Sequence, residues 1–340
     1  MTNSIQPPPT NINWGIIGCG NVTEVKSGPA FNKVPGSSLV SVMRRDAVKA
    51  KDYALRHHVP KWYANASQLI NDPEVNAIYI ATPPKFHEEY TIAALRAGKA
   101  VYVEKPMATN IASCLRMQNM CNETNVKLCV AHYRRALPMF IKIKQLIDHQ
   151  IIGKIRTVRL SMLQPPQSTI IANSETNWRV NPAISGAGLF YDLAPHQLDL
   201  MMHFFGAVAE TYGVSANQAG LYEAEDVVAG VIRFANNIIF SGQWCFTVAD
   251  GTQEDVCEMV GTQGKISFPV FGHEVSLETG NEKKVLEFVP PMHIQQPMIE
   301  EVVNYFLGKG SNPCSASDAI ESMRVMENFV YGSKQEVENY

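Results

Sequence analysis

The chain of 340 residues is long enough for about two domains, and its 46% hydrophobic and 18% charged residues exclude a disordered protein. Its net charge of −3 gives no reason to expect a nucleic-acid partner or a membrane surface. The seven cysteines include no C-x-x-C pair, and neither a signal peptide nor an apolar run of membrane-spanning length is seen, so we expect a cytoplasmic protein with reduced thiols.

Short apolar runs alternate with helical patterns over the first third of the chain. The strands predicted there are 13–18, 37–43, 75–82, 99–106 and 126–133, and the helices are 46–58, 86–98 and 110–124. Strands that alternate with helices of this length form βαβ units around a parallel sheet. We therefore predict a doubly wound α/β domain over residues 1–133.

The pattern changes after residues 136–155. The later strands alternate apolar and polar residues and are joined by short turns, at 227–234, 238–246, 254–261, 265–270, 274–279 and 284–289. This pattern is typical of an antiparallel meander. It predicts a second, α+β domain over residues 134–340 with a large, mostly antiparallel open sheet. An amphipathic stretch at 316–337 is predicted to be a helix that packs back on the body of the protein.

A glycine turn follows the first predicted strand. Gly18 and Gly20 fit the first two positions of a G-x-G-x-x-G motif, whereas Thr23 takes the third. Such glycines allow a tight turn and a close backbone approach to a pyrophosphate at a helix N-terminus, and Gly18, Gly20, Asn21 and Val22 are the cofactor contacts predicted here. The placement at the head of a βαβ run predicts a Rossmann domain that binds a dinucleotide.

The second predicted strand ends at Met43 and is followed by two arginines. A domain that prefers NAD carries an acid here for the ribose 2′-hydroxyl, but this chain has Arg44, with Arg45 beside it. Arg44 can bind a 2′-phosphate and Arg45 can stack on adenine, so NADP is the predicted cofactor and NAD the possible one. The alternative is a pair of solvated surface arginines. Asp46 is expected to cap the next helix.

The strand at 99–106 runs directly into Glu104-Lys105-Pro106. Proline cannot donate to a sheet ladder, so the strand must stop there. One interpretation is an ordinary polar strand end. The other is a catalytic Lys105 held at the carboxyl edge of a parallel sheet.

A polar stripe marks a predicted helix that follows Gly186 and Gly188, with Pro195 expected in its first turn. Its members recur on one helical face: Asp192, His196, Asp199 and His203. The two nearest the glycine loop, Asp192 and His196, are candidate catalytic residues. A buried network of Asp199 with His203 is the second interpretation. A metal site of His196, Asp199 and His203 is the third, and we predict no metal because this spacing is not an established ligand pattern.

Five motifs together resemble the glucose–fructose oxidoreductase/inositol dehydrogenase/rhizopine catabolism (Gfo/Idh/MocA) family: GIIGCGN, ATPPKFH, EKP, NWR and DLAPHQLD, in this order. The resemblance implies a catalytic set of Lys105, Asp192 and His196, and often a cis Lys-Pro bond in EKP. It also implies cofactor contacts from Thr82, Pro83, His87, Glu104, Lys105, Trp178 and Arg179. Without it, His87 would be a helix-start histidine and Trp178 a core residue.

The function implied is hydride transfer between NAD(P), with NADP preferred, and a sugar, polyol or related cyclic hydroxy or keto compound. His196 would act as general acid or base, and Lys105 would stabilise charge on the reacting oxygen. Two alternatives stay open: redox-assisted glycoside hydrolysis with retained NAD, and a non-catalytic NADP-binding regulator. Relatives pair the second-domain sheet between subunits, so a homodimer or homotetramer through this sheet is expected. The loop at 164–177 is expected to contribute to substrate selectivity.

Overall fold

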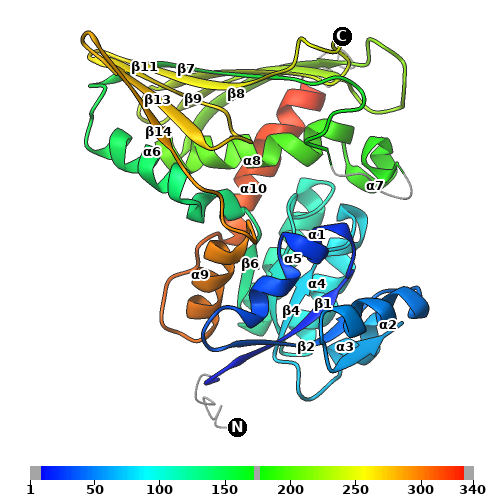
Figure 1. The fold of residues 1–340 in the computed structure, drawn as a ribbon. Helices are drawn as coiled ribbons and strands as arrows, with labels where there is room; N and C mark the ends of the chain where they lie inside the picture. The colour runs from blue at the N-terminus through cyan, green and yellow to red at the C-terminus, as the bar shows by residue number, and fades with distance from the viewer. Residues whose placement is uncertain (1–8, 172–176, 333–340) are drawn as a thin grey trace.

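The computed structural model describes residues 9–171 and 177–332, which form two sheets with helices around them (Figure 1). The predicted loop therefore lies partly outside the described residues, as do positions 333–337 of the predicted last helix. Over the described ranges no helix is long and apolar enough to cross a membrane.

The first sheet has six parallel strands, which confirms the predicted Rossmann domain. Their order is β3 (Lys61–Tyr63), β2 (Ser37–Met43), β1 (Ile12–Ile17), β4 (Ala77–Ile80), β5 (Ala100–Val103) and β6 (Leu128–Val130). The central strand β4 is buried throughout because helices cover both faces of the sheet. These helices are α1 (Asn21–Val25), α2 (Ala47–Arg56), α3 (Ala66–Ile70), α4 (His87–Arg96) and α5 (Ile111–Thr124), with 3₁₀ turns η1 (Gly28–Asn32), η2 (Pro84–Phe86) and η3 (Tyr133–Ala136).

The second sheet has eight strands and lies on top of the molecule in Figure 1. Their order is β14 (Glu282–Glu287), β13 (Glu274–Thr279), β12 (Gly264–Phe268), β11 (Glu254–Gly261), β7 (Ile155–Leu163), β10 (Ile239–Cys245), β9 (Val227–Phe234) and β8 (Val208–Ala216). All pairs are antiparallel except β7 with β10. The predicted large, mostly antiparallel sheet is confirmed, and β11 to β14 follow one another as in a meander. The position of β7 departs from a continuous meander, because β7 lies between β11 and β10 and the chain reaches β10, its parallel neighbour, only after β8 and β9.

Helices cover only one face of this second sheet (Figure 1). They are α6 (Pro138–Asp148), α8 (Gly188–Phe205) and α10 (Ala316–Glu327), and short α7 (Pro182–Ser185) and the 3₁₀ turn η4 (Trp178–Val180) precede α8. Burial in β10 alternates strictly, so that Phe240, Gly242 and Trp244 face the helices and the residues between them face outward. The predicted last helix changes into a π turn, η5 (Asn328–Gly332), where Phe329 packs against two glycines of the sheet, Gly213 and Gly230.

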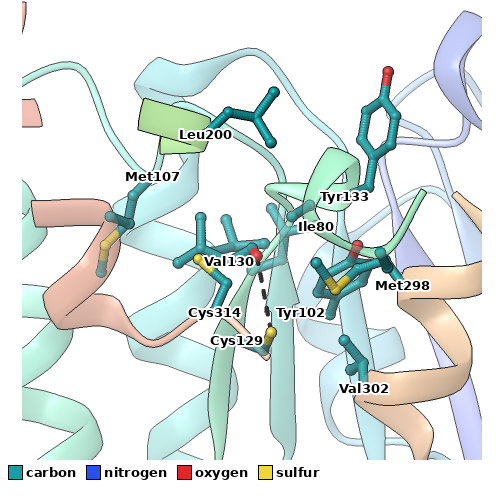
Figure 2. Close-up of a cluster of buried hydrophobic side chains, with 14 of the residues drawn as sticks. Ile80, Tyr102, Met107, Cys129, Val130, Tyr133, Leu200, Met298, Val302 and Cys314 are labelled. Carbon is teal, nitrogen blue, oxygen red and sulfur yellow. Dashed lines mark hydrogen bonds between the residues drawn. The ribbon is translucent and has the colours of Figure 1, made fainter. Parts of the chain in front are cut away.

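Helix α9 (Gln296–Phe306), which the sequence analysis missed, returns to the Rossmann domain beside β6 (Figure 1). Its Phe306 ring lies 5.5 Å from that of Trp14 in β1. Figure 2 shows the resulting apolar cluster, in which Met298 and Val302 of α9 and Leu200 of α8 approach residues of the parallel sheet. The two domains thus share buried apolar surface at the place where their polar residues also meet. The division at residue 133 stays a prediction.

Candidate active site

A cavity of about 400 Å³ lies between the domains, at the carboxyl edge of the parallel sheet. Parallel α/β sheets bind ligands at this edge. Every predicted site residue except His87 lines the cavity: Gly18, Gly20, Asn21, Val22, Arg44, Arg45, Thr82, Pro83, Glu104, Lys105, Trp178, Arg179, Asp192 and His196. The fold thus brings together residues that come from both domains.

Lys105 and Asp192 join the two domains inside this cavity. The Lys105 Nζ donates to Asp192 Oδ1 at 3.1 Å and to the carbonyl oxygen of Asp192 at 2.7 Å. That carbonyl belongs to the turn before Pro195, which lies inside α8 and not in its first turn as expected. Proline has no N–H to bond the carbonyl of Tyr191, so the helix ladder is interrupted in the turn that receives Lys105.

Glu104 holds the backbone from which Lys105 projects. Its buried carboxylate accepts from the Tyr79 hydroxyl at 2.5 Å and from the Gln295 amide at 2.7 Å, and its other oxygen accepts from the Lys105 N–H at 3.2 Å. The Lys105–Pro106 peptide bond is cis. Gln295 lies just before α9, so the returning segment helps to fix the position of this strand end.

Asp192 has two cationic partners. Arg179 Nε donates to Asp192 Oδ2 at 2.9 Å, and the Arg179 guanidinium also lies 4.4 Å from the centre of the Trp178 ring. Burial alone would raise the pKa of Asp192, but Lys105 and Arg179 outweigh it and lower that pKa to about 2. Asp192 is therefore an anion at neutral pH and keeps Lys105 oriented toward the cavity.

His196 lies one helical turn after Asp192 and is buried. Its ring centre is 5.1 Å from that of Tyr133 and 5.7 Å from that of Phe271. Burial, followed by the positive charges of Lys105 and Arg134, lowers the pKa of His196 well below its ordinary value. His196 is consequently a neutral imidazole at pH 7, which can accept a proton.

The glycine turn fits a phosphate-bearing cofactor. Gly18 has φ +94°, and a Cβ atom there would lie 2.9 Å from the Thr82 nitrogen, so only glycine is tolerated. At Gly20 an added Cβ would meet no atom closer than 3.8 Å, so the space beside its backbone is open. Two arginines also suit a phosphate-bearing cofactor. The Arg44 guanidinium donates to the Cys19 carbonyl at 3.3 Å, and the Arg45 guanidinium lies 5.1 Å from the Phe86 ring centre. Asp46 caps α2 as expected.

His87 lies beneath the cavity and is absent from its lining among the described residues. Its Nδ1 is 3.0 Å from the Pro106 carbonyl and its Nε2 is 2.8 Å from the Thr82 carbonyl. The ring thus joins the ends of two strands that line the cavity. The predicted contact of His87 with the cofactor stays a prediction, while the ring itself contacts the Thr82 backbone beside the cavity.

Asp199 pairs with Arg135, not with His203 as expected. Both Asp199 oxygens accept from Arg135, at 2.8 and 2.7 Å, and His203 affects Asp199 only through a longer-range charge interaction. Among the described residues the group with metal-ligand spacing is His132, Asp199 and Cys314. A guanidinium already takes both carboxylate oxygens there, which disfavours a cation.

The sequence analysis missed several residues that line the cavity. Among them are Lys26, Tyr133, Arg134, Phe271 and Gln295. Tyr133 and Arg134 follow β6, so the strand-end rule that identified Lys105 could have identified them, but the predicted strand was drawn too long. Phe271 and Gln295 come from distant segments of the second domain, and no local pattern marks them.

Comparison with known proteins places this site in a family. Residues 12–132 match the family described as "Oxidoreductase family, NAD-binding Rossmann fold", and residues 140–267 match the "GFO/IDH/MocA C-terminal domain". Oxidoreductase P35 of Formosa agariphila is 43% identical over 94% of this chain and 98% of its own length. The chain belongs to the GFO/IDH/MocA oxidoreductase family. It is therefore an enzyme of a family that binds NAD(P), and the resemblance noted in the sequence is confirmed.

More distant GFO/IDH/MocA proteins are similar over much of the chain. Levoglucosan dehydrogenase of Pseudarthrobacter phenanthrenivorans is 28% identical over 76% of this chain and 73% of its own. A solved levoglucosan dehydrogenase in complex with NADH has a TM-score of 0.84 at 22% identity, covering 94% of this chain and 96% of that chain. The aldose-aldose oxidoreductase from Caulobacter crescentus also gives 0.84 at 22% identity, covering 96% and 98%. These two structures confirm the fold alone.

Proposed function

We propose that this protein transfers hydride between NADP, in preference to NAD, and a CH–OH carbon of a sugar, polyol or related cyclic compound. The observation that carries the proposal is the joint presence of Lys105, Asp192 and His196 in the cavity that also contains the Gly18–Gly20 turn. The names of the relatives support the substrate class, since they include a levoglucosan dehydrogenase and a 1,5-anhydro-D-fructose reductase.

The three polar residues have distinct roles in this proposal. In alcohol oxidation, neutral His196 accepts the proton of the reacting hydroxyl, and in ketone reduction it returns that proton. The Lys105 ammonium donates to the same oxygen and stabilises its developing negative charge. Asp192 holds Lys105 in place, with Arg179 as its second partner. The nicotinamide, when bound, supplies the hydride chemistry.

The preference for NADP rests on Arg44 and Arg45. Both line the cavity at the end of β2, where an NAD-preferring domain carries an acid. Arg45 lies over Phe86, whose ring stacks in turn with Tyr90 at 6.4 Å. A flat aromatic and guanidinium surface beside a basic group suits an adenosine that carries a 2′-phosphate.

The protein is also proposed to assemble through the uncovered face of its second sheet. Tyr212 and Val231 are cross-strand neighbours on that face and are 68% and 42% exposed. Val214 and Ile239 extend the apolar surface over the same strands. Exposed apolar patches of this kind mark interaction sites, and a flat sheet face suits a symmetric pairing.

The test of the proposed function follows nicotinamide absorbance with purified protein, NADPH or NADP⁺ and a panel of sugars, polyols and keto sugars. Turnover that stops in Lys105→Ala and His196→Ala but persists in Lys33→Ala, a surface control, supports the proposal. Release of a glycosidic leaving group without net change in absorbance supports redox-assisted hydrolysis instead. Tight NADPH binding with no turnover of any compound supports the regulator.

A further inference from the structure

A second cavity of about 330 Å³ adjoins the candidate active site. Its walls come from the start of α6 and from the segments 271–273 and 288–294. It shares four residues with the first cavity, which are Lys26, Tyr133, Arg134 and Phe271. The two compartments therefore have a common wall, and two of its residues, Tyr133 and Phe271, contact the His196 ring.

The lining of the second cavity combines aromatic rings with positive charge. The rings are Tyr133, Phe140, Phe271 and Phe288, and the positively charged side chains are Lys26 and Arg134. Among its described lining residues there is no aspartate or glutamate. Rings offer flat apolar surface to a carbon skeleton, and the unbalanced charge favours an anionic group on that skeleton.

Arg134 is the most unusual of these residues because it is a buried cation without a counter-ion. It is 7% exposed, and its guanidinium lies 4.3 Å from the centre of the Phe271 ring. Its Nη1 donates to the Val270 carbonyl at 2.6 Å, while its buried Nε has no hydrogen-bond partner. No carboxylate of the described residues forms an ion pair with it, whereas its neighbour Arg135 is paired with Asp199.

The negative charge of Asp255 interacts with Arg134 at longer range, without forming an ion pair. Its two oxygens accept from the backbone N–H groups of Val270 and Phe271, at 3.0 and 2.6 Å. Asp255 thus fixes the segment that supports the guanidinium without neutralising it. A buried charge without a partner is costly, so an anion from outside the chain is the expected partner.

The unpaired guanidinium lies close to the reacting group. Phe271 contacts Arg134 on one side and is 5.7 Å from the His196 ring on the other. Tyr133 similarly approaches both, at 5.4 Å from the guanidinium and 5.1 Å from the imidazole. The rings of Tyr133 and Phe271 therefore lie beside both the anion site and His196.

We propose that the substrate is an acidic saccharide whose carboxylate or sulfate group binds Arg134 at the wall between the two cavities while a nearby hydroxyl reacts at Lys105 and His196. This inference rests on the proposed function, and it assigns Arg134 as the residue that selects for charge. The rest of the sugar, or a second unit attached to it, lies against the aromatic rings of the second cavity.

The test compares matched acidic and neutral sugars: glucuronate with glucose, galacturonate with galactose, and glucose 6-sulfate with glucose. Charge-assisted hydrogen bonds predict a kcat/KM about 10- to 100-fold higher for the acidic member of a pair. Arg134→Gln should remove this preference, which is measured as the ratio of kcat/KM within each pair because Arg134 also acts on the pKa of His196, and should leave NADPH affinity unchanged. The matched control is Arg96→Gln, the same substitution in the last turn of α4. The carboxylate and sulfate pairs show which anion is preferred.

The outcomes separate this inference from the proposed function. Turnover of neutral and acidic sugars with equal kcat/KM overturns the inference and leaves the oxidoreductase intact. If no sugar is turned over, thermal stabilisation of the NADPH-bound protein by uronates but not by neutral sugars still supports an acidic ligand, and its absence overturns it. Loss of NADPH affinity in Arg134→Gln assigns Arg134 to the cofactor and also overturns the inference. If Arg134→Gln fails to fold, Arg134→Lys must keep a reduced preference for acidic sugars.

Discussion

The Lys105 ammonium bonds both the side chain and the backbone carbonyl of Asp192, a residue 87 positions later in the chain. One contact is an ion pair, and the other uses a carbonyl in the helical turn that Pro195 interrupts. Lys105 is therefore held between a strand end of one domain and a helix of the other. This arrangement fixes its ammonium beside the cavity before any substrate arrives.

The first prediction concerns Lys105 and His196. Lys105→Ala removes the charge that stabilises the reacting oxygen and should lower turnover by about a hundred- to a thousandfold. His196→Ala should cost about 10²–10⁴-fold because it removes the proton acceptor. The two act on one oxygen, so the double variant should be little worse than the poorer single variant. Turnover is measured together with melting temperature and NADPH affinity. Folded single variants with near-wild-type turnover would place the active site elsewhere.

The second prediction concerns Arg44 and the cofactor. A charge-assisted contact with the 2′-phosphate contributes roughly 1.5–3 kcal/mol, so wild-type protein should bind NADPH about ten- to a hundredfold more tightly than NADH. Arg44→Ala should abolish most of that difference by weakening NADPH alone. Fluorescence titration of both reduced cofactors measures this, and NADH serves as the internal control. Equal affinities in the wild type would contradict the assignment.

Most elements of the Rossmann domain could be predicted because they depend on local pattern, but the short strand β3 and the short helix α3 were missed. Fully apolar runs predicted the buried strands, and strand ends followed by glycines, arginines or Glu-Lys-Pro predicted the part of the cavity that the parallel sheet supplies. The position of β7 between β11 and β10 could not be predicted, since strand order follows from tertiary packing that leaves no local mark. The same holds for Phe271 and Gln295, which reach the site from far along the chain.

The hydrogen-bond partners of buried polar groups also could not be predicted from the sequence. The helical spacing correctly placed Asp199 near His203, but the Asp199 carboxylate accepts its hydrogen bonds from Arg135, which lies in a different segment. The motif that contains His87 likewise does not show that its ring lies between the Pro106 and Thr82 carbonyls. Helical periodicity shows which residues share one face of a helix. It does not show which residue of a neighbouring segment donates the hydrogen bond to them.

The third prediction concerns assembly through the outer face of the second sheet. Val231→Glu places a charge among Tyr212, Val214 and Ile239, so it should shift an expected dimer or tetramer toward smaller species. The matched control is Val48→Glu on α2, which is 78% exposed and lies on the other domain. Light scattering at micromolar concentration measures both variants. A wild-type protein that is monomeric under these conditions would contradict the proposed interface.

The fourth prediction concerns Asp199. Asp199→Asn leaves Arg135, 11% exposed, with only the partly exposed Asp318 at 3.6 Å as its counter-charge and should lower the free energy of unfolding by up to about 3–5 kcal/mol. Burial alone would raise the pKa of Asp199, but the charges of His132 and Arg135 outweigh burial and lower that pKa. The stabilisation by Asp199 is therefore present above the unfolded pKa of about 3.9. The difference between wild type and variant should therefore shrink as the pH falls below about 4. Denaturant unfolding at several pH values measures this difference.

The control for this prediction is Glu210→Gln, which breaks the exposed pair with Arg233 and should change stability little. Equal effects of the two substitutions would show that the Asp199 pair is unimportant.

The last prediction concerns the pH dependence of catalysis. Alcohol oxidation requires neutral His196, and a lowered pKa keeps the imidazole neutral as the pH falls through the ordinary value of about 6.5. The kcat/KM for the sugar should therefore stay level across that pH and decline only further into the acid range. Ketone reduction needs the protonated form, so its rate should rise as the pH is lowered. Burial contributes most to the lowered pKa and Lys105 adds to it, so Lys105→Met should move the acid limb toward higher pH while also reducing the rate. An acid limb that does not move in Lys105→Met, or one that lies above pH 6.5 in the wild type, would remove His196 as the proton acceptor.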